Sequence, residues 1–454
     1  MKTESRLALT RVFKLCDRNN DGLLCDKELN DFQVMCFKSP LAEKALADVK
    51  NVVSKNCPGG VQYGGLTLDG FLFLHLLFIQ RGRHETTWAV LRKFGYTDAF
   101  GIADEYLTLE NDLQPPPNSI PQLNAEGKQF LVDVFRKYDS DGDDVLTNAE
   151  LKELFSVFPY DPWGSDVLST ICTNQDGEIT LKGFLSQWML TTYLDTSRTL
   201  EYLGYFGFST LRGKQSQADA ICYVDSSREY DDTGAGPRRT IFTCKVVGAK
   251  GVGKSSFLMG LLGQSATRKH ARKGQASVLA INEVELKEGE DPFYLLLHEI
   301  NVAELKSTGD ASFVCDIVCL LYDVTDPDSF QPCVEIYKQF VGSQVSCLVI
   351  ATKADCKPVR QHSVLQLEQF CTSNDLPSPL PFTTSEVDSS IYQTIVSMAS
   401  KPLKTGGSGS GEDSNMLGLC LKVGLVLVLA SATTYGVYKY WRTGEIQFPK
   451  LSIS

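Results

Sequence analysis

The sequence has few of the features that mark nucleic-acid-binding or secreted proteins. It contains no block of basic residues, because 44 lysines and arginines are outnumbered by 55 acidic residues, which gives a net charge of −11. Residues 1–14 are charged and amphipathic, without the apolar run of a secretory signal. The fourteen cysteines include no Cys-x-x-Cys pair. These absences argue against a nucleic-acid binder and favour a reduced, cytosolic compartment.

A phosphate-binding motif organises the second half of the chain. Residues 248–255 read Gly-Ala-Lys-Gly-Val-Gly-Lys-Ser, between a strand-like run at 241–247 and a helix-like run at 256–262. The glycines let backbone N–H groups surround a phosphate, the lysine reaches the β- and γ-phosphates, and the serine hydroxyl can bind Mg²⁺. A glycine-rich turn without a ligand is the alternative. The predicted phosphate-binding residues are Gly248, Lys250, Gly251, Val252, Gly253, Lys254, Ser255 and Ser256, with Ser255 as the magnesium ligand.

Two acidic loops lie in the first half of the chain. Residues 17–28 and 139–150 both carry oxygen ligands at alternate positions and end in glutamate, which is typical of the twelve-residue EF-hand calcium loop. Asp144 stands where glycine is expected, and aspartate tolerates the left-handed conformation needed there. A solvated acidic turn is the alternative for each. The predicted calcium ligands are Asp17, Asn19, Asp21, Leu23 and Glu28 in the first loop, and Asp139, Asp141, Asp143, Val145 and Glu150 in the second.

A weaker repeat accompanies these loops. Residues 64–71 resemble residues 177–184, and both look like the second half of an EF-hand loop that ends in glycine instead of glutamate. Without the bidentate carboxylate neither should hold calcium well, so we expect each to pair with the calcium-competent hand before it. The repeat predicts two EF-hand pairs, at residues 1–110 and 118–212, with the prolines at 115–117 as a stiff connector.

The remainder of the chain alternates strand-like and helical patterns from residue 237 to 400, after a polar boundary near residues 231–237. With its length of 454 residues, the whole chain has room for about three folded units. Strand-like runs at 277–286, 293–300, 316–323 and 347–352 predict a parallel, doubly wound α/β sheet. The expected fold class is therefore two all-α EF-hand pairs, followed by an α/β P-loop domain and a membrane helix.

Two further motifs select guanine over adenine. Residues 352–355 read Thr-Lys-Ala-Asp after a strand, and Thr384 and Ser385 follow another strand-like run. They resemble the base-contacting loops of small GTPases, although Glu386 replaces the usual alanine. The resemblance implies that Thr352, Lys353, Asp355, Thr384 and Ser385 contact the nucleotide, with the Asp355 carboxylate accepting the two donors on the guanine edge.

The motif for hydrolysis is missing. Small GTPases carry Asp-x-x-Gly-Gln after their third strand, which supplies a γ-phosphate amide and a water-positioning glutamine. Here the matching residues 299–303 read Glu-Ile-Asn-Val-Ala, and Lys250 occupies a position that is glycine in Ras. No catalytic residue is therefore predicted, and Thr267 and Ser277 are both candidates for the switch threonine. We expect slow hydrolysis, or nucleotide binding without turnover.

A long apolar segment lies near the end of the chain. Residues 417–438 form a 22-residue segment interrupted by one charge, Lys422, and this length can span a bilayer. Residues 401–415 are rich in glycine and serine and predict a flexible linker. We therefore expect a transmembrane tail anchor at residues 416–440, with a buried core helix as the alternative.

The order of these parts resembles the mitochondrial Rho GTPases (Miro). Local stretches at residues 70–75, 78–88 and 184–188 are similar as well, and the resemblance covers nearly all of residues 5–440. Miro proteins begin with another GTPase domain, which has no counterpart here. The expectation is a truncated form, an alternative product or an incomplete gene model.

The resemblance implies a protein of the mitochondrial outer membrane with most of the chain facing the cytosol. It implies Ca²⁺, Mg²⁺ and GTP or GDP as ligands, and a role in mitochondrial transport and homeostasis. Its implied partners are the Milton/TRAK motor adaptors with kinesin and dynein, and Parkin. Two functions are kept open: a slow GTPase, and a calcium-responsive membrane adaptor whose GTPase-like domain does not hydrolyse nucleotide.

Overall fold

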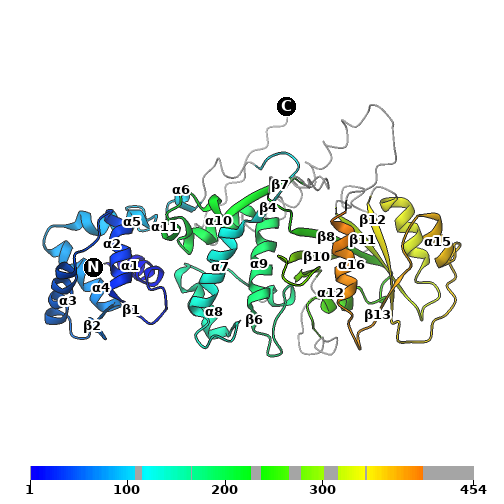
Figure 1. The fold of residues 1–454 in the computed structure, drawn as a ribbon, viewed down its shortest axis with the longest axis horizontal. Coiled ribbons are helices and arrows are strands. Elements are labelled where there is room, and N and C mark those ends of the chain that lie inside the picture. Colours follow the sequence, from blue (N-terminus) through cyan, green and yellow to red (C-terminus); the bar gives the residue numbers. More distant parts are fainter. Residues whose placement is uncertain are drawn as a thin grey trace. The chain divides into compact units, whose positions relative to one another are not determined.

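The computed structural model describes residues 2–107, 115–164, 166–225, 237–264, 278–300, 315–342 and 345–401 (Figure 1). These residues form two units. The first runs to residue 226 and includes residues 236–239, and the second contains the chain from Thr240 onward. Each unit has its own core.

The first EF-hand pair opens the first unit. Helix α1 (Thr3–Cys16) leads into the first acidic loop, and α2 (Asp26–Phe37) follows it. The second hand consists of α3 (Glu43–Asn56) and α4 (Leu68–Gln80), followed by α5 (His84–Lys93) and α6 (Asp104–Leu107). Short strands β1 (Leu23–Leu24) and β3 (Gly65–Thr67) join the two loops antiparallel, and β2 (Val61–Gln62) extends β3. The loops of the two hands are thus joined by a short antiparallel strand pair, whereas the prediction that only the first hand is competent for calcium stays a prediction.

The second pair repeats this plan. Helices α7 (Ala125–Tyr138) and α8 (Asn148–Leu154) flank the second acidic loop. Strand β5 (Val145–Leu146) pairs with β6 (Ile179–Thr180), which precedes α9 (Leu181–Leu194), α10 (Thr196–Tyr205) and α11 (Phe208–Arg212). Asp144 has φ +60°, so the aspartate at the glycine position does adopt the left-handed conformation.

The second pair extends beyond the boundaries expected from the sequence. Strand β4 (Ser119–Leu123) pairs antiparallel with β7 (Ile221–Asp225), which lies beyond residue 212, the predicted end of the second pair. Gln122 donates to the carbonyl oxygen of Arg238 at 2.7 Å, which continues this contact toward the end of the unit. The strands that precede and follow the helices therefore hold each other, a pairing across about a hundred residues that local patterns do not reveal.

The two glycines that end the degenerate loops have a structural reason. A Cβ atom on Gly70 would collide with the carbonyl oxygen of Gly60, and one on Gly183 would collide with that of Cys172. In each case the first turn of a helix packs directly against the beginning of its own loop. Glycine therefore allows a close backbone approach here, and a longer side chain at these positions has no room.

The second unit is built on a six-stranded sheet. Its strands are β8 (Ile241–Gly248), β9 (Leu279–Val284), β10 (Phe293–Glu299), β11 (Ile317–Asp323), β12 (Ser346–Thr352) and β13 (Leu380–Phe382), in the order β13-β12-β11-β8-β10-β9. The predicted sheet is confirmed except at one edge, where β9 runs antiparallel to β10. The apolar pattern of residues 279–284 shows a strand but not its direction, which the connection to β10 decides.

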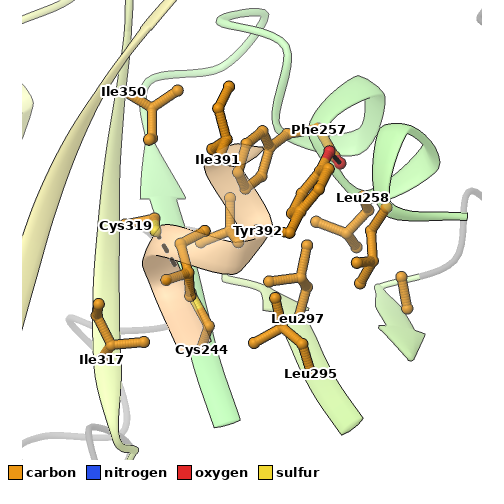
Figure 2. Packing of buried hydrophobic residues seen from close by; sticks show 14 of the residues in the cluster. Cys244, Phe257, Leu258, Leu295, Leu297, Ile317, Cys319, Ile350, Ile391 and Tyr392 are labelled. Atoms are coloured by element: carbon orange, nitrogen blue, oxygen red, sulfur yellow. Dashed lines mark hydrogen bonds between the residues drawn. The ribbon is translucent and has the colours of Figure 1, made fainter. Parts of the chain in front are cut away.

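Helices cover both faces of this sheet, as predicted for a doubly wound fold. On one face, α12 (Lys254–Leu261) and α16 (Ser390–Ala399) pack against alternate residues of the strands, including Ile317 and Cys319 (Figure 2). On the other face, α14 (Gln331–Ile336) and α15 (Leu367–Ser373) pack against the intervening residues Val318 and Leu320. This arrangement leaves the carboxyl ends of the parallel strands open for loops.

No helix in the described part of the chain is long and apolar enough to cross a membrane. The predicted tail anchor at 416–440 and nearly all of the 401–415 linker lie outside the described residues, as do the switch candidates Thr267 and Ser277.

Candidate functional site

The phosphate motif forms a loop between β8 and α12. A Cβ atom on Gly248 would collide with the carbonyl oxygen of Leu321, so only glycine fits where the loop leaves the sheet. Gly251 and Gly253 have φ of +88° and +100°, which side chains rarely adopt. Val252 is buried beneath the loop, Lys250 is exposed, and Ser255 and Ser256 lie in the first turn of α12. The loop therefore has the strand–loop–helix geometry that fits a phosphate group.

The Lys254 side chain folds back over this loop. Its Nζ donates to the carbonyl oxygens of Gly248 and Ala249 at 3.1 and 3.0 Å, and lies 3.9 Å from Glu299 Oε1. Burial lowers the pKa of Lys254, while the nearby Glu299 carboxylate acts in the opposite direction. An ammonium group held against the backbone of this loop is placed to contact phosphate oxygens.

The Thr352–Asp355 loop lies beside the phosphate loop. Thr352 is 1% exposed, and its Oγ1 is 2.6 Å from the carbonyl oxygen of Val252 and 2.9 Å from that of Tyr322. Lys353 has φ +55°, and Asp355 is exposed. The threonine hydroxyl thus connects the predicted base-binding loop directly to the predicted phosphate-binding loop, across a hundred residues of sequence.

The third predicted loop reaches the same edge of the sheet. Strand β13 pairs parallel with β12, so that Phe382 lies opposite Thr352. The Ala354 N–H donates to the carbonyl oxygen of Phe382 at 3.2 Å. Beyond this strand, the hydroxyls of Thr383 and Ser385 are 2.7 Å apart, and Thr384 and Ser385 are exposed. The structure therefore brings together all three segments that the sequence assigns to one nucleotide.

A buried polar network supports the base-binding loop, and sequence patterns did not reveal it. Asp323, at the end of β11, forms an ion pair with Lys353. Burial acts to raise the pKa of Asp323, but hydrogen bonds from Lys353 and Thr325 outweigh this effect, so that its pKa is lowered. Ser329 and Gln361, both buried, bond to the backbone around Asp323 and Asp326. The one sequence signal that could have indicated this network is an acidic residue directly after the apolar run at 317–322.

The residues relevant to hydrolysis are only partly described. Glu299 ends β10 at the carboxyl edge of the sheet, close to Lys254, where small GTPases carry the aspartate of their Asp-x-x-Gly-Gln motif. Residues 301–303 lie outside the described residues. The described residues therefore do not test the prediction of slow hydrolysis, and no catalytic residue is assigned.

The first calcium loop contains an unpartnered oxygen. Asp17 is 3% exposed, and its Oδ2 accepts a hydrogen bond from the Gly22 N–H at 3.0 Å, whereas its Oδ1 is buried without a hydrogen-bond partner. Burial raises the pKa of Asp17. Glu28 accepts hydrogen bonds from the N–H groups of Arg18 and Cys25 across the loop. A buried carboxylate oxygen with no donor fits a cation at the first loop position, near Asn19, Asp21 and the Leu23 backbone.

The second calcium loop gathers three carboxylates. Asp139, Asp141 and Asp143 each offer an oxygen atom, and these atoms lie within 4.8 Å of one another. Repulsion from Asp143 raises the pKa of the Asp141 carboxyl. Glu150 Oε1 accepts from the Ser140 N–H at 2.8 Å, which closes the loop, and Val145 lies in β5. Like charges held this close together favour a bound divalent cation.

Comparison with known proteins agrees with this arrangement. Two family models, both described as "EF hand associated", match residues 39–127 and 163–233. The chain is 41% identical over 407 residues to Mitochondrial Rho GTPase 1 of Caenorhabditis elegans, an alignment that covers 88% of this chain. The chain spans 64% of the length of that relative. Together with the EF-hand pairs and the P-loop domain, this similarity identifies the mitochondrial Rho GTPases as the family that the chain resembles.

Proposed function

We propose that residues 237–400 bind GDP or GTP with Mg²⁺. The observation that carries this proposal is the convergence of three separate loops at one edge of the sheet, through the contacts of Thr352 with Val252 and of Ala354 with Phe382. Lys254 and the loop backbone would hold the phosphates, and Ser255 would bind Mg²⁺. Asp355 would accept the two guanine donors, which adenine lacks.

Nucleotide competition on the full chain tests this proposal. We expect GDP to displace a fluorescent guanine nucleotide far better than ADP does. Asp355→Ala should weaken binding of GDP, and Lys254→Ala should weaken binding through the phosphates. Glu368→Ala removes an exposed carboxylate from α15 and should leave binding unchanged, so it serves as the control. Equal affinity for GDP and ADP in the unmodified chain would contradict the proposal.

We propose that hydrolysis of GTP is slow. The support is the sequence at residues 299–303, which lacks both the glycine and the glutamine that small GTPases use. Single-turnover measurement with GTP separates the two functions kept open. Measurable release of phosphate identifies a slow GTPase, whereas retention of intact GTP identifies an adaptor that binds nucleotide without turnover.

We also propose that the two acidic loops bind Ca²⁺ and that the two glycine-ended loops do not. The unpartnered Asp17 oxygen and the three carboxylates around Asp141 support the two sites. Gly70 and Gly183 supply no carboxylate at the final position of the other two loops and lie tight against backbone carbonyl groups, which supports the absence of calcium there. Calcium binding would then act on two of the four hands.

The proposed location is the cytosolic face of the mitochondrial outer membrane, with residues 416–440 as the anchor. This proposal draws on the apolar segment at 417–438 and on the name of the mitochondrial relative. A fluorescent protein fused before Met1 should label mitochondria and be removed by protease added to intact organelles. Deletion of residues 416–454 should release it; retention on mitochondria would point to another tether. Milton/TRAK adaptors, kinesin and dynein, and Parkin are the partners to test in the same cells.

A further inference from the structure

The lysine of the base-binding loop is held by a carboxylate that no motif includes. Lys353 Nζ forms an ion pair with Asp323 Oδ2 at the end of β11. The Asp323 side chain is 6% exposed, whereas that of Lys353 is 46% exposed. The ammonium end of the lysine is therefore anchored on a buried group, and much of its side chain stays open to the space beside the loop.

Asp323 is itself fixed in place. Its second oxygen, Oδ1, accepts hydrogen bonds from the N–H and the hydroxyl of Thr325 at 2.8 and 2.7 Å. Its backbone N–H donates to Ser329 Oγ at 3.0 Å. Because the carboxylate cannot rotate without losing these bonds, Lys353 must take the conformation that Asp323 sets.

A fixed lysine has a consequence for nucleotide binding. An unheld lysine side chain samples many rotamers, and ordering it on binding costs conformational entropy. An ion pair that fixes the ammonium group beforehand removes much of this cost, as preorganisation does in other binding sites. We propose that Asp323 is a positioning residue for guanine nucleotides, which holds Lys353 so that its aliphatic stem lies ready along the face of the base. This inference rests on the proposed nucleotide function and names a further residue of the same site.

Positioning and charge predict opposite effects of a substitution at Asp323 on GDP binding. Asp323→Asn keeps the shape of the side chain and an oxygen for Thr325 but removes one negative charge. Because GDP is an anion, loss of this charge should strengthen its binding if the residue acted only through the electrostatic field. Positioning predicts weaker binding. The control Asp326→Asn removes an exposed carboxylate from the same turn, without contact to Lys353, and measures the effect of the field alone.

A double-mutant cycle on the full chain tests the proposal, with GDP as the probe. We expect Asp323→Asn to raise the Kd for GDP about tenfold, a typical coupling between residues in contact. Lys353→Met keeps the aliphatic stem and removes the ion pair, and should have a similar effect. The double variant should then bind about as weakly as either single variant, because both remove the same interaction.

Three results would overturn the proposal. The Kd of Asp323→Asn could equal or fall below that of the unmodified chain. The two single effects could add in the double variant, which would show that Asp323 acts through the Thr325 turn rather than through Lys353. Asp326→Asn could weaken binding as much as Asp323→Asn does. Failure of the unmodified chain to prefer GDP over ADP is a different outcome, since it rejects the proposed function itself; thermal unfolding of each variant identifies any loss of fold.

Discussion

Arg11 donates two hydrogen bonds to the carbonyl oxygen of Tyr205, from Nε at 3.1 Å and from Nη2 at 2.8 Å. Its Nη2 also lies 2.8 Å from the carbonyl oxygen of Gly204, and the side chain is buried. Arg11 lies in α1, which leads into the first calcium loop, whereas Tyr205 ends α10 of the second pair. The Arg11 guanidinium, from the first EF-hand pair, therefore caps the carboxyl end of α10 in the second pair. A positive charge is favoured at the carboxyl end of a helix.

This contact predicts a large loss of stability when the guanidinium is removed. Arg11→Met keeps an unbranched side chain but removes the charge-assisted hydrogen bonds to the carbonyl oxygens of Tyr205 and Gly204, which should cost about 2–4 kcal/mol. Three of the four tryptophans (Trp88, Trp163 and Trp188) lie in the first unit, so urea unfolding followed by tryptophan fluorescence reports chiefly on it. Arg6→Met, at an exposed position of the same helix, should change stability little. Similar unfolding midpoints for the two variants would mean that the contact contributes nothing measurable.

Calcium titration should count two sites. Glu28→Gln and Glu150→Gln each remove the carboxylate that ends a competent loop, so isothermal calorimetry on either variant should show one site fewer. Glu178→Gln changes a carboxylate in a glycine-ended loop and should leave both sites in place. Four sites in the unmodified chain, or no loss in either variant, would refute the assignment.

Gly70 should tolerate no side chain. Gly70→Ala places a methyl group against the carbonyl oxygen of Gly60, and overpacking of this kind costs about 1–3 kcal/mol. Gly101→Ala is the matched control, since its Cβ would meet only Thr97 Oγ1 at 3.9 Å. The same fluorescence measurement applies. A Gly70→Ala variant as stable as Gly101→Ala would show that the loop and helix separate easily.

Acid should destabilise the first unit through His75. This residue is 3% exposed, packs against the Phe71 ring with centroids 4.7 Å apart, and lies 3.1 Å from Thr87 Oγ1. Burial lowers its pKa to about 4, whereas an unfolded histidine titrates near 6.5. Between these values the unfolded chain binds a proton that the folded chain does not. Stability is therefore unaffected above about pH 6.5 and declines as the pH falls, by about 3 kcal/mol near pH 4.

The variant His75→Asn isolates this contribution. It should be less stable than the unmodified chain at pH 7, yet it should lose less stability between pH 6.5 and 4.5, because it lacks the buried imidazole. Urea unfolding at a series of pH values measures both slopes. Parallel slopes would show that His75 does not set the pH dependence in this range.

The sequence by itself determined the parts that are continuous in the chain. The predicted ligands of each acidic loop and of the phosphate loop lie within twelve residues of sequence. Backbone geometry over so short a span is set by local residues such as Gly22 and Gly253. Alternating patterns also predicted the strands of the second unit. The recurrence of the pattern around Gly70 and Gly183 predicted the paired hands.

Only the tertiary structure decided how distant segments meet. The pairing of β4 with β7, the antiparallel direction of β9, and the ion pair between Asp323 and Lys353 join residues that no local pattern connects. From the sequence, Gly70 was notable only because it replaces a carboxylate. The structure shows that this glycine allows close contact with the Gly60 carbonyl group. Such contacts depend on how helices and strands pack in three dimensions, since packing brings together side chains and backbone groups whatever their separation along the chain.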